Sequence, residues 1–360
     1  MKNILVTGGA GFIGSNFIRY LFENESEVRI VNYDSLTYAG NLDNLAELPK
    51  QHWYQFKRGD VCDGGHLDQV LRKYQINLVV HFAAETHVDR STLNPEIFHQ
   101  TNFFGTLTLL EAFRKYYLTV NESRRNDLHF HHISTDEIYG SLDREQEPFT
   151  EDSLEKPNSV YAASKAASDV LVRSYFQAFG LPITITNCSN NYGPYQYPEK
   201  LVPLVILNAL AGKLLPIYGD GQQIRDWIFI KDHCRAIWKV IQAGRLGQVY
   251  LVAGTNQTTN LEIIREICSL LDEKFPESKY VPHIKLTRHV KDRQGHDRRY
   301  ALNTGKISAE LGWMPDVKLR QGLEKTINWY LEHPEWVQNV LNQPNYQQWL
   351  EDNYLDRDKN

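Results

Sequence analysis

The N-terminal segment passes from a short apolar run into a glycine-rich turn and then into a helical pattern. Asn3–Thr7 is apolar and rich in β-branched residues, Gly8–Gly14 reads Gly-Gly-Ala-Gly-Phe-Ile-Gly, and Ser15–Glu23 carries apolar residues at helical spacing. A strand, a glycine turn and a helix in this order can bind pyrophosphate, because the turn brings backbone N–H groups at the helix N-terminus close to the phosphates. The order therefore predicts a parallel α/β fold that binds a dinucleotide.

A carboxylate stands where such a fold contacts the ribose of its dinucleotide. The apolar run Val28–Tyr33 ends in Asp34, 20 residues after Gly14. A carboxylate here accepts hydrogen bonds from both ribose hydroxyls and repels a 2′-phosphate, which favours NAD over NADP. The alternative is an ordinary turn residue at a strand end. Asp60, which follows a strand expected over Trp53–Arg58, has two similar interpretations, a contact with the adenine amino group or a simple turn.

The fourth expected strand, Leu78–Phe82, runs into Ala83 and Ala84, whose small side chains leave room for a cofactor. The next residues include Glu85, His87, Asp89 and Arg90. Their spacing matches no metal-ligand pattern, and we expect an ion-paired loop without a metal. A long helix is expected over Pro95–Tyr117, with apolar residues along one face.

Four polar side chains, Ser134, Thr135, Asp136 and Glu137, end the fifth expected strand, which begins near His131. Ligands of open α/β sheets bind outside the carboxyl ends of the strands, so this cluster indicates acid–base chemistry. The alternative is a helix cap, because Ser, Thr and Asp often begin the next helix.

A helix is expected to begin after Pro157, with Ser159 as its cap. Tyr161 and Lys165 lie four residues apart in it and share one face. We expect the Lys165 ammonium to lower the phenol pKa, so that Tyr161 can act as a base. The same spacing also occurs in ordinary amphipathic helices, but its combination with the glycine turn and with Ser134-Thr135 favours catalysis.

The pattern changes after a sixth strand, expected over Pro182–Asn187. Short helices, expected over residues 201–211, 233–243, 261–271 and 320–333, then alternate with short strands and proline-rich loops. We predict an α/β fold of the Rossmann type. A doubly wound parallel sheet would bind NAD over residues 1–190, and a smaller mixed α/β lobe would bind substrate over 191–335, with some chain crossing back. Residues 336–360 would form a C-terminal tail without an assigned function.

The composition limits the classes of molecule that the chain is expected to bind. With 42% hydrophobic and 23% charged residues and a formal net charge of -5, the chain has no global reason to bind nucleic acid or an anionic membrane. Its four cysteines are far apart and form no C-x-x-C pair, which favours a reduced, cytoplasmic compartment. The N-terminus lacks the pattern of a targeting segment, and no run of apolar residues approaches the length of a membrane span.

The chain resembles the extended short-chain dehydrogenases/reductases that act on nucleotide sugars, and within them the dTDP-glucose 4,6-dehydratases. The resemblance is carried by Thr135–Glu137, Asn187–Pro194, Pro198–Leu201, Gln223–Trp227 and Gly295–Tyr300. Related epimerases lack the Asp-Glu pair after the threonine, so this triplet is the most diagnostic feature. Two departures stand out: Gln294 occupies a position where the family usually has proline, and Tyr250–Gly254 replaces a more usual Tyr-Asn-Ile-Gly-Gly.

The resemblance implies a redox cycle on dTDP-glucose. Tyr161, helped by Lys165 and Thr135, would take the C4 hydroxyl proton while hydride passes from C4 to NAD. Glu137 would then remove the C5 proton, and a protonated Asp136 would deliver its proton to the departing C6 hydroxyl. Hydride would return to C6 and give the 4-keto-6-deoxy sugar. A homodimer is expected through the helices over Pro95–Tyr117 and Val160–Gly180.

The expected binding residues form two sets. The NAD set comprises Gly8, Gly11, Phe12, Ile13, Gly14, Asp34, Ser35, Leu36, Thr37, Asp60, Val61, Phe82, Ala83, Ala84, Thr101, Tyr161, Lys165 and Asn191. The nucleotide-sugar set comprises Thr86, Thr135, Asn190, Lys200, Leu201, Pro216, Tyr218, Arg225, Asn260, Arg293 and His296. Arg225 and Arg293 are expected to bind the diphosphate, since guanidinium groups match phosphate oxygens in pairs. Their alternative is a surface ion pair with the neighbouring Asp226 or Asp292.

The sequence is also compatible with other functions. The nearest are a UDP-sugar 4-epimerase, a UDP-glucose 4,6-dehydratase and a decarboxylase of the same superfamily. A more distant alternative is a non-catalytic protein that senses a dinucleotide, although such proteins usually lose the tyrosine or the lysine.

Overall fold

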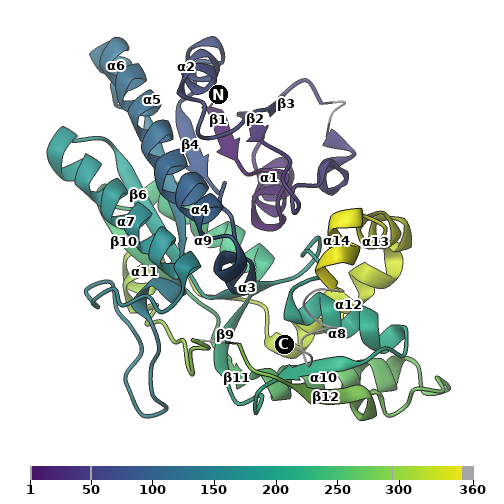
Figure 1. Ribbon diagram of the computed structural model, residues 1–360. Coiled ribbons are helices and arrows are strands. Elements are labelled where there is room, and N and C mark those ends of the chain that lie inside the picture. Colours follow the sequence, from purple (N-terminus) through teal and green to yellow (C-terminus); the bar gives the residue numbers. More distant parts are fainter. Residues whose placement is uncertain (1, 49–50, 294, 351–360) are drawn as a thin grey trace.

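Seven parallel strands form the central sheet of the computed structural model, which describes residues 2–48, 51–293 and 295–350 (Figure 1). The strand order is β10-β6-β5-β4-β1-β2-β3. The strands are β1 (Lys2–Thr7), β2 (Val28–Asp34), β3 (Tyr54–Arg58), β4 (Leu78–His81), β5 (His129–Thr135), β6 (Ile183–Cys188) and β10 (Val249–Val252). The chain moves outward from β1 in one direction through β2 and β3, and in the other through β4, β5 and β6. This reversal between β1 and β4 marks the place where such sheets bind ligands.

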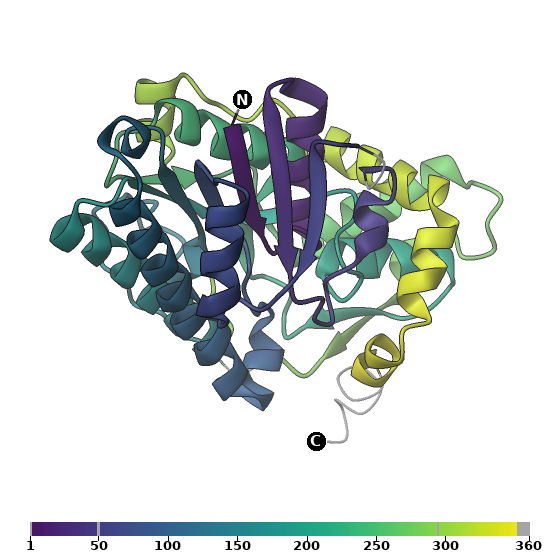
Figure 2. The same ribbon diagram turned by 90° about the horizontal axis from the view of Figure 1, so that it is seen from above.

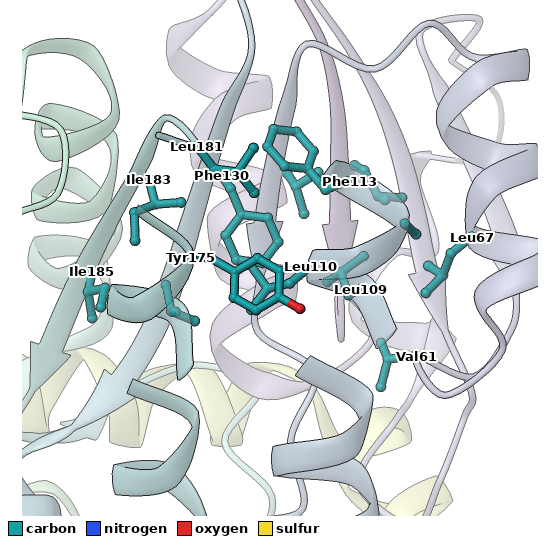
Figure 3. Packing of buried hydrophobic residues seen from close by; sticks show 14 of the residues in the cluster. Val61, Leu67, Leu109, Leu110, Phe113, Phe130, Tyr175, Leu181, Ile183 and Ile185 are labelled. Carbon is teal, nitrogen blue, oxygen red and sulfur yellow. The ribbon is translucent and has the colours of Figure 1, made fainter. Parts of the chain in front are cut away.

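Helices cover both faces of the sheet, so its strands are apolar on both sides. Leu5 of β1 packs in one core with α2 (Gly64–Lys73), α5 (Thr106–Thr119) and α7 (Val160–Phe179). Its neighbours Ile4 and Val6 point the other way, into a core with α1 (Phe12–Asn24) and α9 (Ile230–Ala243). Figure 3 shows the first core, in which the Phe113 ring packs against Phe130 of strand β5.

The predicted helix over Pro95–Tyr117 is present but is not a uniform α-helix. It begins as α4 (Pro95–Phe98), continues as a π-helical segment η3 (His99–Gly105), and becomes α5. π-Helical segments are rare and often lie at functional sites. Here the segment carries Thr101, which lines the cavity described below.

The smaller lobe, at the lower right of Figure 1, has its own core. It contains a three-stranded sheet of β11 (Gln257–Thr259), β9 (Ile224–Phe229) and β7 (Asn190–Tyr192), and the parallel pair β12 (Thr287–Val290) and β8 (Leu215–Tyr218). Three helices pack on these strands: α8 (Leu201–Leu210), α10 (Asn260–Lys274) and α12 (Leu319–Glu332). With α9, they confirm the four predicted helices of this half within a few residues.

Part of the second half returns to the large sheet. The strand β10 pairs with β6, α9 packs against α1, and α11 (Gly305–Leu311) packs against β10. The sequence patterns did not reveal α2, which begins with two glycines, nor the short helices α3 (Val88–Leu93) and α6 (Glu122–Arg125). None of the described helices combines the length and the apolarity needed to span a membrane.

The end of the chain forms two helices, α13 (Pro334–Leu341) and α14 (Pro344–Leu350), over much of the predicted tail. Trp336, Tyr346 and Trp349 are buried in them. The Trp336 indole N–H donates to the Asn44 side-chain oxygen at 2.8 Å, which ties α13 to the loop after β2. Figure 2 shows these helices, in yellow, beside that purple N-terminal segment. Residues 351–360 of the predicted tail lie outside the described part of the chain.

Candidate active site

Two cavities lie at the carboxyl edge of the large sheet. The larger, of about 480 Å³, is lined by residues from the ends of β1, β2, β4 and β5, around the point where the strand order reverses. The smaller, of about 210 Å³, extends toward the small lobe. Glu137, Tyr161 and Lys200 line both, so the cavities meet at these side chains.

The glycine turn has the close packing that a pyrophosphate site needs. Gly8 has a φ of +70°, and a Cβ there would lie 2.6 Å from the backbone nitrogen of Ala83. A Cβ on Gly14 would lie 2.3 Å from the Gly8 carbonyl oxygen. At Gly11 a Cβ would meet only that same oxygen, at 3.3 Å, so its other side is open to the cavity. The backbone at the start of α1 can thus approach a phosphate closely, and the residues present fit NAD.

Asp34 combines both of its expected roles. Its carboxylate accepts hydrogen bonds from the N–H groups of Ala10 at 2.9 Å and Leu36 at 2.8 Å, as a turn residue does. It also lines the larger cavity. Asp60 behaves similarly: it accepts from the Cys62 N–H at 2.8 Å and lines the same cavity. The turn interpretations are therefore compatible with binding.

All residues predicted to contact NAD line the larger cavity except Leu36. Leu36 adopts a φ of +57° and contributes its backbone N–H to Asp34. Its expected contact with NAD stays a prediction, and in the structure its backbone N–H holds the Asp34 carboxylate. The cavity brings the other predicted residues together from seven segments of chain.

Thr135, Asp136 and Glu137 leave β5 and enter a short 3-10 helix, η4 (Asp136–Tyr139). The Thr135 hydroxyl accepts a hydrogen bond from the Glu137 N–H at 3.3 Å, which confirms the helix-cap role. It also lies 3.4 Å from Asp136 Oδ1, to which it donates. Asp136 Oδ2 is buried without a hydrogen-bond partner in the described residues. All three side chains line the larger cavity, so the cap does not exclude chemistry.

The two carboxyl groups have different electrostatic surroundings. Burial, and then the neighbouring Glu137, hold the pKa of Asp136 well above its ordinary value. Burial also raises the pKa of Glu137, but the positive charges of Arg225 and Lys200 oppose this. Such surroundings favour a neutral Asp136 beside a more readily ionised Glu137.

Tyr161 and Lys165 lie on α7, which begins as predicted with Ser159 accepting from the Ala162 N–H at 3.1 Å. Lys165 Nζ donates to the Ile133 carbonyl at 2.8 Å, and burial lowers its pKa to about 8. Burial and the Glu137 charge raise the phenol pKa of Tyr161 well above its ordinary value. The predicted lowering of this pKa by Lys165 is therefore wrong for this arrangement, because burial and the carboxylate charges set the direction while Lys165 Nζ binds the Ile133 carbonyl.

All residues predicted to contact the nucleotide sugar line the smaller cavity except Thr135, which lines the larger. Arg225 donates to the carbonyls of Ile224 at 2.8 Å and Asp297 at 2.9 Å, and its guanidinium stacks on the Tyr300 ring at 4.1 Å. It is buried, so a surface ion pair with Asp226 is excluded.

Arg293 forms an ion pair with Asp89, a partner that the sequence did not indicate. Its Nε lies 3.4 Å from Asp89 Oδ1, and its guanidinium lies over the Tyr218 ring at 4.9 Å. Asp89 and Arg90 are both ion-paired, as expected, and Arg90 pairs with the distant Glu199. The expected loop is wrong at these two residues, which lie in helix α3. The predicted effect of Gln294 falls outside the described residues.

Several cavity residues were not among those predicted. Glu199 and Tyr300 lie within the motifs Pro198–Leu201 and Gly295–Tyr300, so a signal for them was present. Gln100 and Gln196 had no such signal, because single amides in loops and irregular helices carry no recognisable pattern. Within residues 2–48, 51–293 and 295–350, no three His, Cys, Asp or Glu side chains are grouped to bind a metal.

Comparison with known proteins agrees with this geometry. Residues 5–326 match the family described as GDP-mannose 4,6 dehydratase. This chain belongs to that dehydratase family. It is 49% identical over 362 residues to the dTDP-glucose 4,6-dehydratase of Salmonella typhimurium, covering 98% of this chain and 99% of the relative.

Two solved structures of the same kind are also similar to this dehydratase-family chain. The dTDP-glucose 4,6-dehydratase of Streptomyces venezuelae, solved with NAD bound, is 43% identical with a TM-score of 0.85, covering 94% of this chain and 99% of that one. The enzyme of the same name from Bacillus anthracis, in complex with NAD, is 42% identical with a TM-score of 0.83, covering 94% and 100%. The predicted Rossmann-type fold is confirmed.

Proposed function

We propose that this chain is a dTDP-glucose 4,6-dehydratase that uses NAD to convert dTDP-glucose into dTDP-4-keto-6-deoxyglucose. The observation that carries the proposal is the pair Asp136 and Glu137, which lie side by side in the cavity wall with different electrostatic surroundings. Elimination of water requires one group that accepts a proton and one that donates it. The relatives of that name support the same reaction.

The first step oxidises C4. When bound, NAD accepts hydride from the sugar and later returns it. Tyr161 lies at the meeting point of the cavities, with the Thr135 hydroxyl beside it, and takes the proton of the C4 hydroxyl. The acceptor is the phenolate form of Tyr161, and because burial opposes that form, it needs a positive charge nearby. Lys165, held by the Ile133 carbonyl, supplies one such charge at the base of the site.

The second step eliminates water across C5 and C6. The C4 ketone acidifies the C5 proton, which passes to the Glu137 carboxylate. The C–O bond at C6 breaks as Asp136 gives its proton to the departing hydroxyl, and water leaves. Hydride then adds to C6, and Glu137 returns its proton to C5. A proton must also pass from Tyr161 to Asp136, directly or through solvent, before the starting protonation states are restored. Burial favours these proton transfers, because charge interactions and hydrogen bonds are stronger in a site from which water is excluded.

The smaller cavity binds the nucleoside diphosphate portion. Arg225 and Arg293 line it, and their guanidinium groups are held by the rings of Tyr300 and Tyr218. Guanidinium groups fixed in this way provide paired donors for phosphate oxygens. Lys200 adds a further positive charge where this cavity meets the larger one.

The proposal is tested by giving the purified protein dTDP-glucose and UDP-glucose in separate reactions in deuterium oxide. We expect a 4-keto-6-deoxy product from dTDP-glucose with deuterium at C5, and slower turnover of UDP-glucose. Preferential turnover of UDP-glucose would favour the UDP-sugar alternative. A C4 epimer without a keto product would identify an epimerase. A third reaction with an acid sugar nucleotide would reveal a decarboxylase by release of carbon dioxide, and no turnover in any of the three would indicate a sensing protein.

We also propose that residues 1–190 bind NAD and that residues 191–335 bind the sugar nucleotide.

We further propose that the protein is a cytoplasmic homodimer. Exposed apolar side chains on the helices expected at the dimer contact support that assembly: Ile97, Phe104, Leu118, Val170 and Phe179. Burial of these faces in a four-helix contact would stabilise the dimer. Sedimentation at micromolar concentration should give twice the chain mass, and a monomer there would contradict the proposal.

A further inference from the structure

Arg90 lies between two aromatic rings that come from opposite ends of the chain. Its guanidinium carbon is 3.8 Å from the centroid of the Tyr38 ring, in the loop after β2, and 3.9 Å from that of the Trp349 ring, in α14. Arg90 itself belongs to α3. Cation–π contacts of this kind strengthen when the cation is removed from water. Three segments far apart in sequence thus converge on one guanidinium group.

The same guanidinium holds a carboxylate at the wall of both cavities. Arg90 donates through Nε at 3.0 Å and Nη2 at 2.9 Å to Glu199 Oε2. The Tyr38 hydroxyl lies 3.0 Å from Glu199 Oε1. The Glu199 side chain is 1% exposed and lines both cavities. A buried carboxylate bound at both oxygens has a fixed orientation, and loss of its cation leaves an uncompensated buried charge.

Glu199 is followed by Lys200, the residue just before α8. Lys200 lines both cavities, as Glu137 does. Burial lowers the pKa of Lys200, and the charges of Glu199 and then Glu137 oppose that effect. A fixed Glu199 therefore helps to keep Lys200 in place and charged beside the group that removes the C5 proton.

Helix α14 is attached to this segment at a second point. The Tyr346 ring packs edge-on against Tyr197 at 5.7 Å, and the Tyr346 hydroxyl lies 3.5 Å from the Pro198 carbonyl oxygen. Trp349 also packs edge-on against His87, which lines the smaller cavity, at 5.1 Å. The last described helix therefore touches residues that flank the site on two sides.

We propose that Arg90 and Trp349 are positioning residues for the dehydration, which hold Glu199 and, through it, Lys200 where the two cavities meet. In this arrangement α14 supports the active site from behind the cavity wall, although it is far from the site in sequence. The inference rests on the proposed function, because it assigns residues to that reaction.

Two pairs of variants of the full-length enzyme test this role. Arg90→Met removes the charge and keeps the length of the side chain, whereas Arg90→Lys keeps the charge without the paired donors. Trp349→Leu removes the ring, whereas Trp349→Phe keeps an aromatic face. Arg245→Met serves as the control, since Arg245 also pairs with a glutamate, Glu310, but neither residue lines the cavities. The measurements are kcat and KM for dTDP-glucose, together with the melting temperature.

We expect Arg90→Met to lower kcat by roughly 10- to 100-fold, the scale on which displacement of an active-site group by about 1 Å acts. Arg90→Lys should recover only part of this loss. Trp349→Leu should lower kcat by about fivefold or more, and Trp349→Phe should restore it to within about twofold, at similar melting temperatures. The Arg245→Met control should retain the kcat of the unaltered enzyme.

The outcomes separate this inference from the function on which it rests. If the unaltered enzyme does not turn over dTDP-glucose, the proposed function and the inference both fail. If it does, and Arg90→Lys and Trp349→Leu both match its kcat, only the positioning role is overturned. If Arg90→Met does not fold, the Trp349 pair decides, because equal kcat values for Leu and Phe contradict the role of the ring.

Discussion

Asp136 and Glu137 are adjacent in sequence and chemically alike, yet their surroundings assign them different tasks. Both are buried, which raises both pKa values. At Glu137 the positive charges of Arg225 and Lys200 are the largest effects that oppose this rise, whereas at Asp136 the Glu137 charge adds to it. Two nearby carboxyl groups with separated protonation preferences form an acid and a base in one site. The division of roles therefore depends on residues that are 60 or more positions away in the chain.

Replacement of the base tests this division. Glu137→Gln keeps the shape of the side chain but cannot accept the C5 proton. We expect exchange of the C5 proton with solvent to fall by about 100-fold or more, while C4 oxidation remains measurable. Exchange is followed by NMR in deuterium oxide and oxidation by NADH absorbance. Exchange at the unaltered rate would mean that another group is the base.

The choice between NAD and NADP should depend on Asp34. In Asp34→Asn the side chain loses its charge and one acceptor oxygen, while the other oxygen can still bind a backbone N–H. We expect NAD affinity to fall by about tenfold and the preference for NAD over NADP to shrink, measured by calorimetry on protein freed of cofactor. Asp63→Asn is the matched control, because Asp63 caps α2 without lining the larger cavity. An unchanged preference would exclude the ribose contact.

At the scale of elements, the glycine turn between β1 and α1 shows how much of this protein could be predicted from its sequence. The buried strands were predictable because parallel strands are continuous apolar runs, and strands, turns and helices alternated in an order that allows few topologies. The six predicted strands agree with β1 to β6 to within two residues at each end. The π-helical segment was not predictable, because its hydrogen bonding depends on packing and not on periodicity.

The C-terminal helices show a different limit. The segment 334–350 is polar overall, and its few apolar residues looked scattered. They include Trp336, Val337 and Val340, at spacings that suit one helical face, so a weak signal was present. The residues against which that face packs come from elsewhere in the chain, so this segment alone does not show that its apolar residues are buried. The pKa of Tyr161 was missed for the same reason: burial depends on the assembled molecule, whereas the Tyr–Lys spacing describes a single helix.

Two glycines of the turn should respond differently to alanine. In Gly14→Ala the new Cβ would lie 2.3 Å from a backbone oxygen, so we expect loss of stability even without cofactor. In Gly11→Ala the nearest atom is at 3.3 Å, and the methyl group would instead occupy space facing the cavity. We expect it to lower NAD affinity by tenfold or more at a nearly unchanged melting temperature of the cofactor-free protein. Equal effects of the two variants on stability would contradict the assignment of these glycines.

At the scale of the whole molecule, the large sheet and the small lobe line one continuous site, and the C-terminal helices pack behind it. The cores of the two lobes extend through different parts of the chain. Strand β5 contains the buried histidines His131 and His132, and His233 of α9 lies close by. Burial lowers the pKa of each, so the folded molecule keeps them neutral.

These histidines predict a loss of stability in acid. Burial lowers the pKa of His233 to about 3 from its ordinary value of 6.5. As pH falls from 6.5 toward 3, the unfolded chain takes up a proton there that the folded chain does not, so the free energy of unfolding decreases. The slope contributed is at most about 1.4 kcal/mol per pH unit. His233→Gln should reduce this slope in urea unfolding series between pH 6.5 and 4, and an unchanged slope would show that His233 is protonated in both states.

The most direct test of the dehydratase mechanism is a single turnover of dTDP-glucose by Asp136→Asn enzyme with NAD bound. The variant keeps the size of the side chain and removes the proton intended for the C6 hydroxyl. We predict that NADH absorbance at 340 nm rises and persists, since C4 is oxidised but water is lost at least about 100-fold more slowly. Formation of the 4-keto-6-deoxy sugar at the unaltered rate, without persistent NADH, would contradict the assignment of Asp136 as the acid.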